Sequence, residues 1–235
     1  MRQIVLDVET TGLEPSEGHR IIEIGCIELS NRRFTDQRYH QYLQPERKID
    51  TEASKVHGIT NEFLQDKPRF ANIVNEFITF IKDAELIIHN ADFDVKFINY
   101  ELKLLKQSWK PLDHYCQILD TLALARQHHP GQKNNLDALC KRYNVDNSNR
   151  QLHGALLDAE ILAEVYLAMT GGQVSLLGQD KKIEWKGGQT IKRISSQRPV
   201  LTRLFPTEEE LHAHEQRLTD INGVSKGKCL WYSLE

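Results

Sequence analysis

The chain has 235 residues, of which 40% are hydrophobic and 27% are charged. It is long enough for one sizeable domain with an appendage or for two small domains, and no apolar run approaches the roughly 18 residues that a membrane span needs. The net charge of −3 excludes a protein that holds nucleic acid by phosphate neutralisation alone. Because no membrane span is predicted, we expect a soluble, cytoplasmic protein. Its cysteines show no C-x-x-C spacing and are predicted to be reduced packing residues.

Charge is unevenly distributed along the chain. Residues 171–235 contain 10 Lys and Arg against 8 Asp and Glu, which leaves a net charge of −5 for residues 1–170. An acidic first domain fits a metal-loaded site better than a broad phosphate-binding surface. If the substrate is nucleic acid, bound metal ions and a partner protein must therefore supply part of the attraction.

The first 170 residues show strand and helix patterns. Strand-like alternation covers 4–9, 21–29 and 37–43, with a hairpin turn at 31–33, and two shorter strands are predicted at 86–88 and 115–119. Helices are predicted over 70–82, 93–105, 121–127, 136–143 and 154–169, the last one stopping at Gly171-Gly172. A hairpin followed by strand–helix alternation predicts an α/β fold, in which helices flank a mixed sheet.

The sequence changes character after Gly172. Residues 173–199 are polar and lack sustained periodicity, so we expect a flexible linker. A small helix follows, opened by a capping-box pattern at Thr207–Glu210. An isolated helix of this length is marginally stable in water. The composition of residues 200–235 therefore favours a segment that docks on a partner, with a disordered tail as the alternative.

Two carboxylates stand at the end of the first predicted strand. Because side chains on a strand alternate faces, Ile4, Leu6 and Val8 point one way, and Asp7 and Glu9 point together the other way. Adjacent carboxylates both stay ionised only if a cation lies between them. Mg²⁺ prefers oxygen ligands of this kind, so the pair is a candidate metal site.

Further acidic positions lie near predicted helix starts. Asp94 falls in the first turn of a helix, where the backbone N–H groups favour an anion; Asp92 is its rival, and one of the two is expected to be only a helix cap. Asp158 lies in a helix that is apolar almost all round, so it needs a cation or strong donors. His153, at or just before the start of that helix, could face the same site as a general base.

Four carboxylates on three elements and one histidine suggest two divalent metal ions. Such sites most often hydrolyse phosphodiesters, with one ion activating water and the other stabilising the leaving oxygen, about 3.5–4 Å apart. A serine or cysteine nucleophile is not indicated, because the sequence contains no G-x-S-x-G and no Cys near a His in a suggestive pattern. Glycine motifs of nucleotide-binding loops are also absent from the sequence.

Three ordered motifs resemble those of the DEDDh exonuclease family: D-x-E-T-T-G at Asp7–Gly12, N-A-x-F-D at Asn90–Asp94 and H-x-x-x-x-D at His153–Asp158. The resemblance implies a ribonuclease H-like fold and the removal of nucleotides from 3′ ends. Nearly the whole chain further resembles the family of epsilon proofreading subunits of bacterial DNA polymerase III. That likeness implies an exonuclease domain over residues 1–172, a flexible linker over 173–199 and a polymerase-docking segment over 200–235.

The resemblance also implies roles for individual residues. Asp7 would bridge two ions, Mg²⁺ or Mn²⁺, with Glu9 and Asp158 completing the first site and Asp94 holding the second, which leaves Asp92 a bystander. His153 would deprotonate the attacking water. The residues expected to contact the substrate are Asp7, Glu9, Thr10, Thr11, Gly12, Glu52, His57 and Asp158. Of these, Glu52 and His57 belong to a segment that would be read as a structural loop without the resemblance.

The implied partners are a single-stranded or frayed DNA 3′ end and the polymerase alpha subunit, which would bind residues 200–235. Residues 173–178 resemble a sliding-clamp motif, but Gly178 stands where an aromatic residue is usual, so this contact should be weak. A small third core subunit is left open. The alternatives are an RNA-trimming exonuclease, disfavoured by the linker and tail, and a non-catalytic subunit that stabilises the polymerase, disfavoured by the intact carboxylates and histidine.

Overall fold

The computed structural model describes residues 1–105, 109–150, 152–171 and 205–225, together with residues 227, 229 and 231. The chain divides into two compact units, one within residues 1–179 and the other within residues 180–235. The predicted linker over 173–199, with its clamp-like segment 173–178, lies outside the described residues, as do residues 200–204 of the predicted docking segment.

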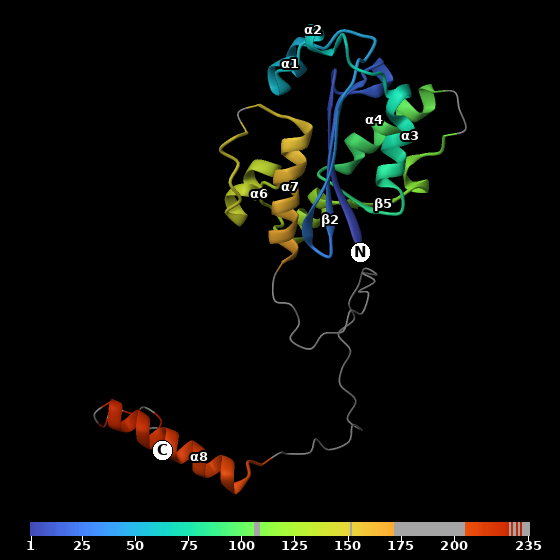
Figure 1. Cartoon of the computed structure of the whole chain (residues 1–235). Helices are drawn as coiled ribbons and strands as arrows, with labels where there is room; N and C mark the ends of the chain where they lie inside the picture. The colour runs from blue at the N-terminus through green and yellow to red at the C-terminus, as the bar shows by residue number, and fades with distance from the viewer. Residues whose placement is uncertain are drawn as a thin grey trace. The chain divides into compact units, whose positions relative to one another are not determined.

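A five-stranded mixed sheet forms the centre of the first unit (Figure 1). β1 (Arg2–Thr10), β2 (Ile21–Ser30) and β3 (Arg33–Tyr42) form an antiparallel meander, and β4 (Glu85–Ile88) pairs in parallel with β1 and β5 (Gln117–Asp120) with β4. The order is β3-β2-β1-β4-β5, so β1 is the central strand. The carboxyl ends of β1, β4 and β5 meet at one edge of the sheet, where ligand sites of such sheets commonly lie.

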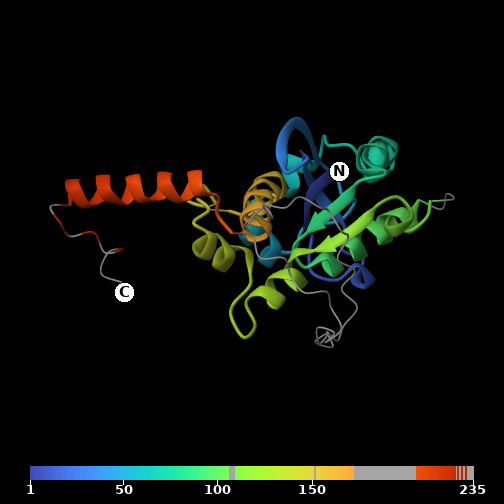
Figure 2. The same cartoon turned by 90° about the horizontal axis from the view of Figure 1, so that it is seen from below.

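Helices cover both faces of the sheet. In the first unit they are α1 (Thr51–His57), α2 (Asn61–Leu64), α3 (Phe70–Ile81), α4 (Ala91–Leu104), α5 (Thr121–His128), α6 (Leu136–Tyr143) and α7 (Ala155–Thr170), with short 3₁₀ turns at Pro15–Glu17 and Leu112–His114. Figures 1 and 2 show α3 and α4 on one side of the sheet and α6 and α7 on the other. This arrangement confirms the predicted α/β fold with a mixed sheet and flanking helices.

Alternation along β1 separates two apolar cores. Ile4, Leu6 and Val8 pack into the core that contains α3 and α4, whereas Val5 belongs to the core that contains α6 and α7. The period of two predicted for this strand is therefore confirmed. It directs the intervening odd-numbered side chains, including Asp7, toward the α7 side of the sheet.

Several elements differ from the predictions; α2 (Asn61–Leu64) was not predicted, and β5 begins at Gln117 instead of residue 115. The predicted loop around Glu52 is the helix α1, whose single buried residue leaves no apolar stripe in the sequence. β3 begins at Arg33 instead of residue 37, because the start of this edge strand is polar and largely exposed and so lacks apolar alternation. α4 begins at Ala91, two residues before the predicted start. The four cysteines are free and buried, as predicted.

The second unit contains the helix α8 (Glu208–Val224), which has the predicted capping box. Thr207 Oγ1 accepts a hydrogen bond from the Glu210 backbone N–H at 3.3 Å, and Glu210 Oε2 accepts one from the Thr207 backbone N–H at 2.8 Å. No residue of α8 is buried, and its exposed apolar side chains include Leu211, Ile221 and Val224. Among the described residues, no helix has the length and apolar character required to cross a membrane.

Candidate active site

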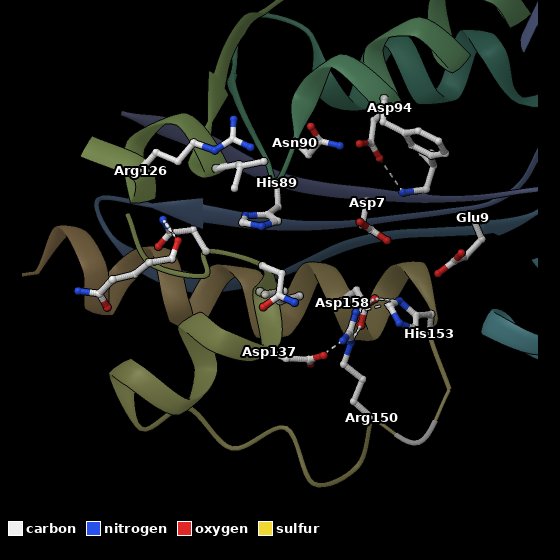
Figure 3. A pocket seen from close by; sticks show the side chains of 17 residues that line it. Asp7, Glu9, His89, Asn90, Asp94, Arg126, Asp137, Arg150, His153 and Asp158 are labelled. Atoms are coloured by element: carbon white, nitrogen blue, oxygen red, sulfur yellow. Dashed lines mark hydrogen bonds and ion pairs between the residues drawn. The ribbon is translucent and has the colours of Figure 1, made fainter. Parts of the chain in front are cut away.

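A cavity of about 750 Å³ lies beside the carboxyl end of β1 and the first turns of α4 and α7 (Figure 3). Its wall contains five predicted site residues, Asp7, Glu9, Asp94, His153 and Asp158. They come from a strand, two helices and the segment before the second helix, which are far apart in the sequence. The fold therefore brings together the residues of three separate motifs.

Gly25 of β2 controls how closely α7 approaches this part of the sheet. It pairs in register with Asp7 of β1. A Cβ atom on Gly25 would lie 2.2 Å from the backbone N of Leu156, well inside van der Waals contact. Because Gly25 has no side chain, the first turn of α7 packs directly on the strand pair. This close approach brings Asp158, in the same turn, next to Asp7 and Glu9.

Asp94 reaches the cavity from the first turn of α4. The helix follows Asn90, whose left-handed backbone (φ 66°) turns the chain from β4 into α4. Asp94 is buried, and its Oδ1 accepts a hydrogen bond from the Val8 backbone N–H at 3.1 Å, which ties α4 to β1. Asp92 is exposed and does not line the cavity. Of the two candidates that the sequence left open, only Asp94 is at the site.

Asp158 is held by Arg150 and His153. Its Oδ1 accepts a hydrogen bond from Arg150 Nε at 2.5 Å, its Oδ2 accepts one from Arg150 Nη2 at 2.7 Å, and Oδ2 lies 3.1 Å from His153 Nδ1. The His153 side chain is 44% exposed, and its backbone N–H donates to the Val56 carbonyl of α1 at 3.1 Å. Ligand atoms of Glu9, His153 and Asp158 all lie within 4.8 Å of one another. These three residues have the spacing of a metal site.

Burial and mutual repulsion raise the pKa of three carboxyls. Burial, and then the charges of Asp94 and Glu9, raise the pKa of Asp7 well above its ordinary value. Burial and the charge of Asp158 raise the pKa of Glu9 to about 8, and burial raises that of Asp94 to about 8. All three can be ionised together at neutral pH only if cations neutralise them. Converging oxygen donors of this kind fit divalent metal ions.

The pKa values of Asp158 and His153 shift in the opposite sense, toward the charged forms. Burial raises the pKa of Asp158, but hydrogen bonds from Arg150 and His153 outweigh this effect and hold it below its usual value. The hydrogen bond to Asp158 in turn raises the pKa of His153, although burial acts against the shift. His153 therefore has a basicity suited to accepting a proton near neutral pH.

The remaining predicted substrate residues, Thr10, Thr11, Gly12, Glu52 and His57, do not line this cavity. Thr10 Oγ1 donates to the Gly12 carbonyl at 2.7 Å, and Thr11 is fully buried, so both threonines shape the turn after β1. Glu52 is exposed on α1. His57 is buried, and its Nε2 has no hydrogen-bond partner among the described residues. A contact between these five residues and a substrate stays a prediction.

The cavity wall includes polar residues that the sequence did not single out. They are His89, Arg126, Gln132, Asn134, Asn135, Asp137 and Arg150. Most of them lie in or beside loops, where no periodicity indicates side-chain direction. A signal existed for Arg150, because the buried Asp158 was expected to need a cation or strong donors. The sequence could not show which residue supplies them.

Comparisons with known proteins agree with the motifs. The exonuclease family model matches residues 4–166. The DNA polymerase III subunit epsilon of Salmonella typhimurium (strain LT2) is 54% identical over 238 residues, covering 98% of this chain and 97% of that protein. The subunit of the same name from Escherichia coli (strain K12) is 52% identical over 236 residues, with coverage of 98% and 97%.

Solved exonucleases share the fold. Exonuclease X in complex with 5′ overhanging duplex DNA aligns with a TM-score of 0.56 at 24% identity, covering 71% of this chain and 90% of that one. The nuclease domain of 3′hExo, a DEDDh family member bound to rAMP, aligns with a TM-score of 0.60 at 17% identity, covering 72% and 90%. These likenesses confirm the predicted ribonuclease H-like fold. The family model and the bacterial relatives show that the chain belongs to the exonuclease family and, within it, to the epsilon subunits of bacterial DNA polymerase III.

Proposed function

We propose that the protein hydrolyses the last phosphodiester at the 3′ end of a DNA strand and releases mononucleotides, as the proofreading subunit of a bacterial replicative polymerase. The observation that carries this proposal is the convergence of four carboxylates and His153 on one open cavity. Membership of the epsilon subunits supports DNA as the substrate. Because these relatives are bacterial, the proposed place of action is the cytoplasm.

Two divalent ions, Mg²⁺ or Mn²⁺, are the proposed cofactors. Asp7 has the central position on β1 and would bridge the two ions, with Glu9 and Asp158 completing the first site and Asp94 holding the second. Bound ions of this kind polarise the phosphodiester and stabilise the charge that develops in an in-line displacement. Asp94 accepts a hydrogen bond from the Val8 N–H, which supports a fixed position of this carboxylate relative to β1.

His153 is the proposed general base. Its side chain is about half exposed at the cavity, so an imidazole nitrogen can face a water molecule that attacks the terminal phosphodiester. The segment before α7 is held to α1 by the hydrogen bond to the Val56 carbonyl, which orients the backbone of His153. General-base catalysis of this type contributes about 10²–10⁴-fold to the rate.

Selectivity for mismatches would follow from fraying. A mispaired 3′ end costs less free energy to unstack, so its terminal nucleotide reaches a single-strand site more often than a paired one. The acidic first 170 residues bring little DNA affinity of their own. The subunit would therefore depend on its polymerase for access to the primer end.

Residues 200–235 are the proposed docking segment for the polymerase alpha subunit. The described part of this segment contains α8, which has no buried residue and exposes Leu211, Ile221 and Val224. A helix without a core of its own gains stability by laying its exposed apolar side chains on a partner. Weak contact of residues 173–178 with a sliding clamp, and binding of a small third core subunit, remain parts of this proposal.

The test is Mg²⁺-dependent release of mononucleotides from matched DNA, mismatched DNA and RNA 3′ ends, with wild type and His153→Ala side by side. We expect DNA to be degraded, faster at mismatches, with a loss of at least about 10²-fold in the variant. Preference for RNA would contradict the proposed substrate and move the protein to RNA trimming. No release from any substrate would leave only a polymerase-stabilising subunit.

A further inference from the structure

Arg150 places a guanidinium inside the carboxylate site. Its side chain is only 8% exposed, and it pairs with both oxygens of Asp158, through Nε at 2.5 Å and Nη2 at 2.7 Å. Its third nitrogen, Nη1, donates to Asp137 Oδ1 at 2.7 Å. Figure 3 shows Arg150 between these two aspartates and beside His153. A buried carboxylate requires a cationic partner, and Arg150 is such a partner for Asp158.

The guanidinium and a metal ion compete for Asp158. A carboxylate offers about four lone-pair positions, and here Arg150 uses one on each oxygen while His153 approaches Oδ2 at 3.1 Å. The carboxylate oxygens of Glu9 and Asp158 between which an ion would stand lie within 4.8 Å of each other. A metal ion bound to Asp158 would lie close to the Arg150 guanidinium, which is bound to the same carboxylate. Two neighbouring cations repel each other strongly in a partly buried site.

His153 faces the same competition. Its Nδ1 lies 2.8 Å from Arg150 Nη2, which can only donate, and 3.1 Å from Asp158 Oδ2, which can only accept when ionised. One ring nitrogen of a neutral imidazole cannot accept and donate at the same time. For a neutral ring the two contacts of Nδ1 therefore exclude each other: Nδ1 either accepts from Arg150 Nη2 or donates to Asp158 Oδ2. If Arg150 withdraws, Nδ1–H can donate to Asp158 and Nε2 becomes an acceptor.

Asp137 provides a place for the displaced guanidinium. It lies in the first turn of α6, lines the same cavity, and its side chain is 53% exposed. Because the hydrogen bond from Arg150 Nη1 already exists, the side chain can stay attached to Asp137 while it leaves Asp158. No new partner has to be found, so the exchange requires only rotation of the Arg150 side chain.

We propose that Arg150 is a positioning residue that serves as the counter-ion of Asp158, and that a divalent ion entering between Glu9 and Asp158 displaces its guanidinium toward Asp137. The same displacement frees Nδ1 of His153 to donate to Asp158, so that ion binding and the orientation of the general base are coupled. The inference rests on the proposed function, because it assumes that this cavity binds divalent ions.

The first test is the affinity of the full-length chain for Mn²⁺ alone, measured by electron paramagnetic resonance for wild type, Arg150→Gln and Arg126→Gln. Arg126 lines the same cavity, but its side chain makes no ion pair or hydrogen bond among the described residues, so it is a control for the loss of one positive charge. We expect Arg150→Gln to bind Mn²⁺ about tenfold more tightly than the control, equivalent to ~1.4 kcal/mol. An affinity equal to or weaker than the control would overturn the proposal, because a purely structural Arg150 would help to assemble the ligands.

The second test uses the wild-type chain and so does not depend on folding of a variant. Mg²⁺ is titrated into ¹⁵N-labelled protein while the Nε resonance of Arg150 and the ring nitrogens of His153 are followed. We expect the Arg150 resonance to shift and the imidazole to change from the Nε2–H to the Nδ1–H tautomer with the same midpoint. Saturation with Mg²⁺ without either change would overturn the proposal. Neither test measures nuclease activity, so a failure here is distinct from a failure of the proposed function.

Discussion

The substitution Gly25→Ala should separate α7 from the sheet and thereby inactivate the site. A Cβ atom at this position would lie 2.2 Å from the backbone N of Leu156, whereas ordinary contact begins at 3.4 Å. The obstacle is helix backbone, which cannot rotate away as a flexible side chain can. The first turn of α7 must therefore retreat by about 1 Å, the difference between the two distances, and it takes Asp158 with it.

Both stability and activity should respond to this displacement. Overpacking of this kind costs about 1–3 kcal/mol of the free energy of unfolding. A displacement of about 1 Å in a catalytic group costs on the order of 10²-fold in rate. We therefore expect Gly25→Ala to remain folded below its lowered melting temperature while it releases mononucleotides about 10²-fold more slowly than wild type. Circular dichroism and a 3′-end release assay measure the two effects.

The matched control is Gly154→Ala, at the N-cap of the same helix. A Cβ atom on Gly154 meets nothing within 4 Å, and its backbone (φ −154°) is accessible to any residue. Alanine is a poor N-cap, so this variant should lose about 0.5–1 kcal/mol of stability without moving Asp158. If Gly25→Ala were as active as Gly154→Ala under conditions where both are folded, the proposed role of Gly25 in placing Asp158 would be refuted.

Two further predictions concern the carboxylates. Asp94→Asn should reduce mononucleotide release by at least about 10²-fold, because a neutral amide is a weaker metal ligand than the buried carboxylate. The control Asp92→Asn, at an exposed position, should stay within about threefold of wild type. Equal losses in the two variants would contradict the choice of Asp94. The second prediction is a pH dependence of stability in EDTA. Since the folded-state pKa values of Glu9 and Asp94 are raised to about 8, their protonated forms stabilise the fold at low pH, and this contribution is lost as the pH rises through about 8. Urea unfolding between pH 5 and 9 should therefore show a declining free energy of unfolding, by at most ~1.4 kcal/mol per pH unit for each carboxyl, and saturating Mg²⁺ should remove the decline. If the free energy of unfolding depended on pH in the same way with and without Mg²⁺, these carboxyls could not be the source of the decline.

Local patterns in the sequence were sufficient to predict the direction of side chains on β1 and the residues at the starts of two helices. Alternation in β1 placed Asp7 and Glu9 on the face opposite Ile4, Leu6 and Val8, because strand geometry fixes which side chains share a face. The position of Asp94 in the first turn of α4 and the capping box of α8 were likewise readable, since each depends on residues within one helical turn. The three motifs then indicated the family and the carboxylate set.

The helix α1 shows why some elements were not predicted. With one buried residue in seven, it has no apolar periodicity, and its stability depends on the contacts that it makes in the folded chain. One of these contacts, the Val56 carbonyl, holds the backbone of His153. The structural support of the general base therefore comes from a segment whose sequence pattern does not indicate a helix.

The sequence by itself determined which residue types carry the chemistry and the elements on which most of them lie. The tertiary structure decided which of them meet. Gly25 and Leu156 are distant in the sequence, yet their contact sets the position of Asp158. Arg150 became a candidate only when folding placed it on both oxygens of that aspartate. The physical reason is that periodicity and capping act within a few residues, whereas the position of a helix on a sheet depends on packing between distant segments.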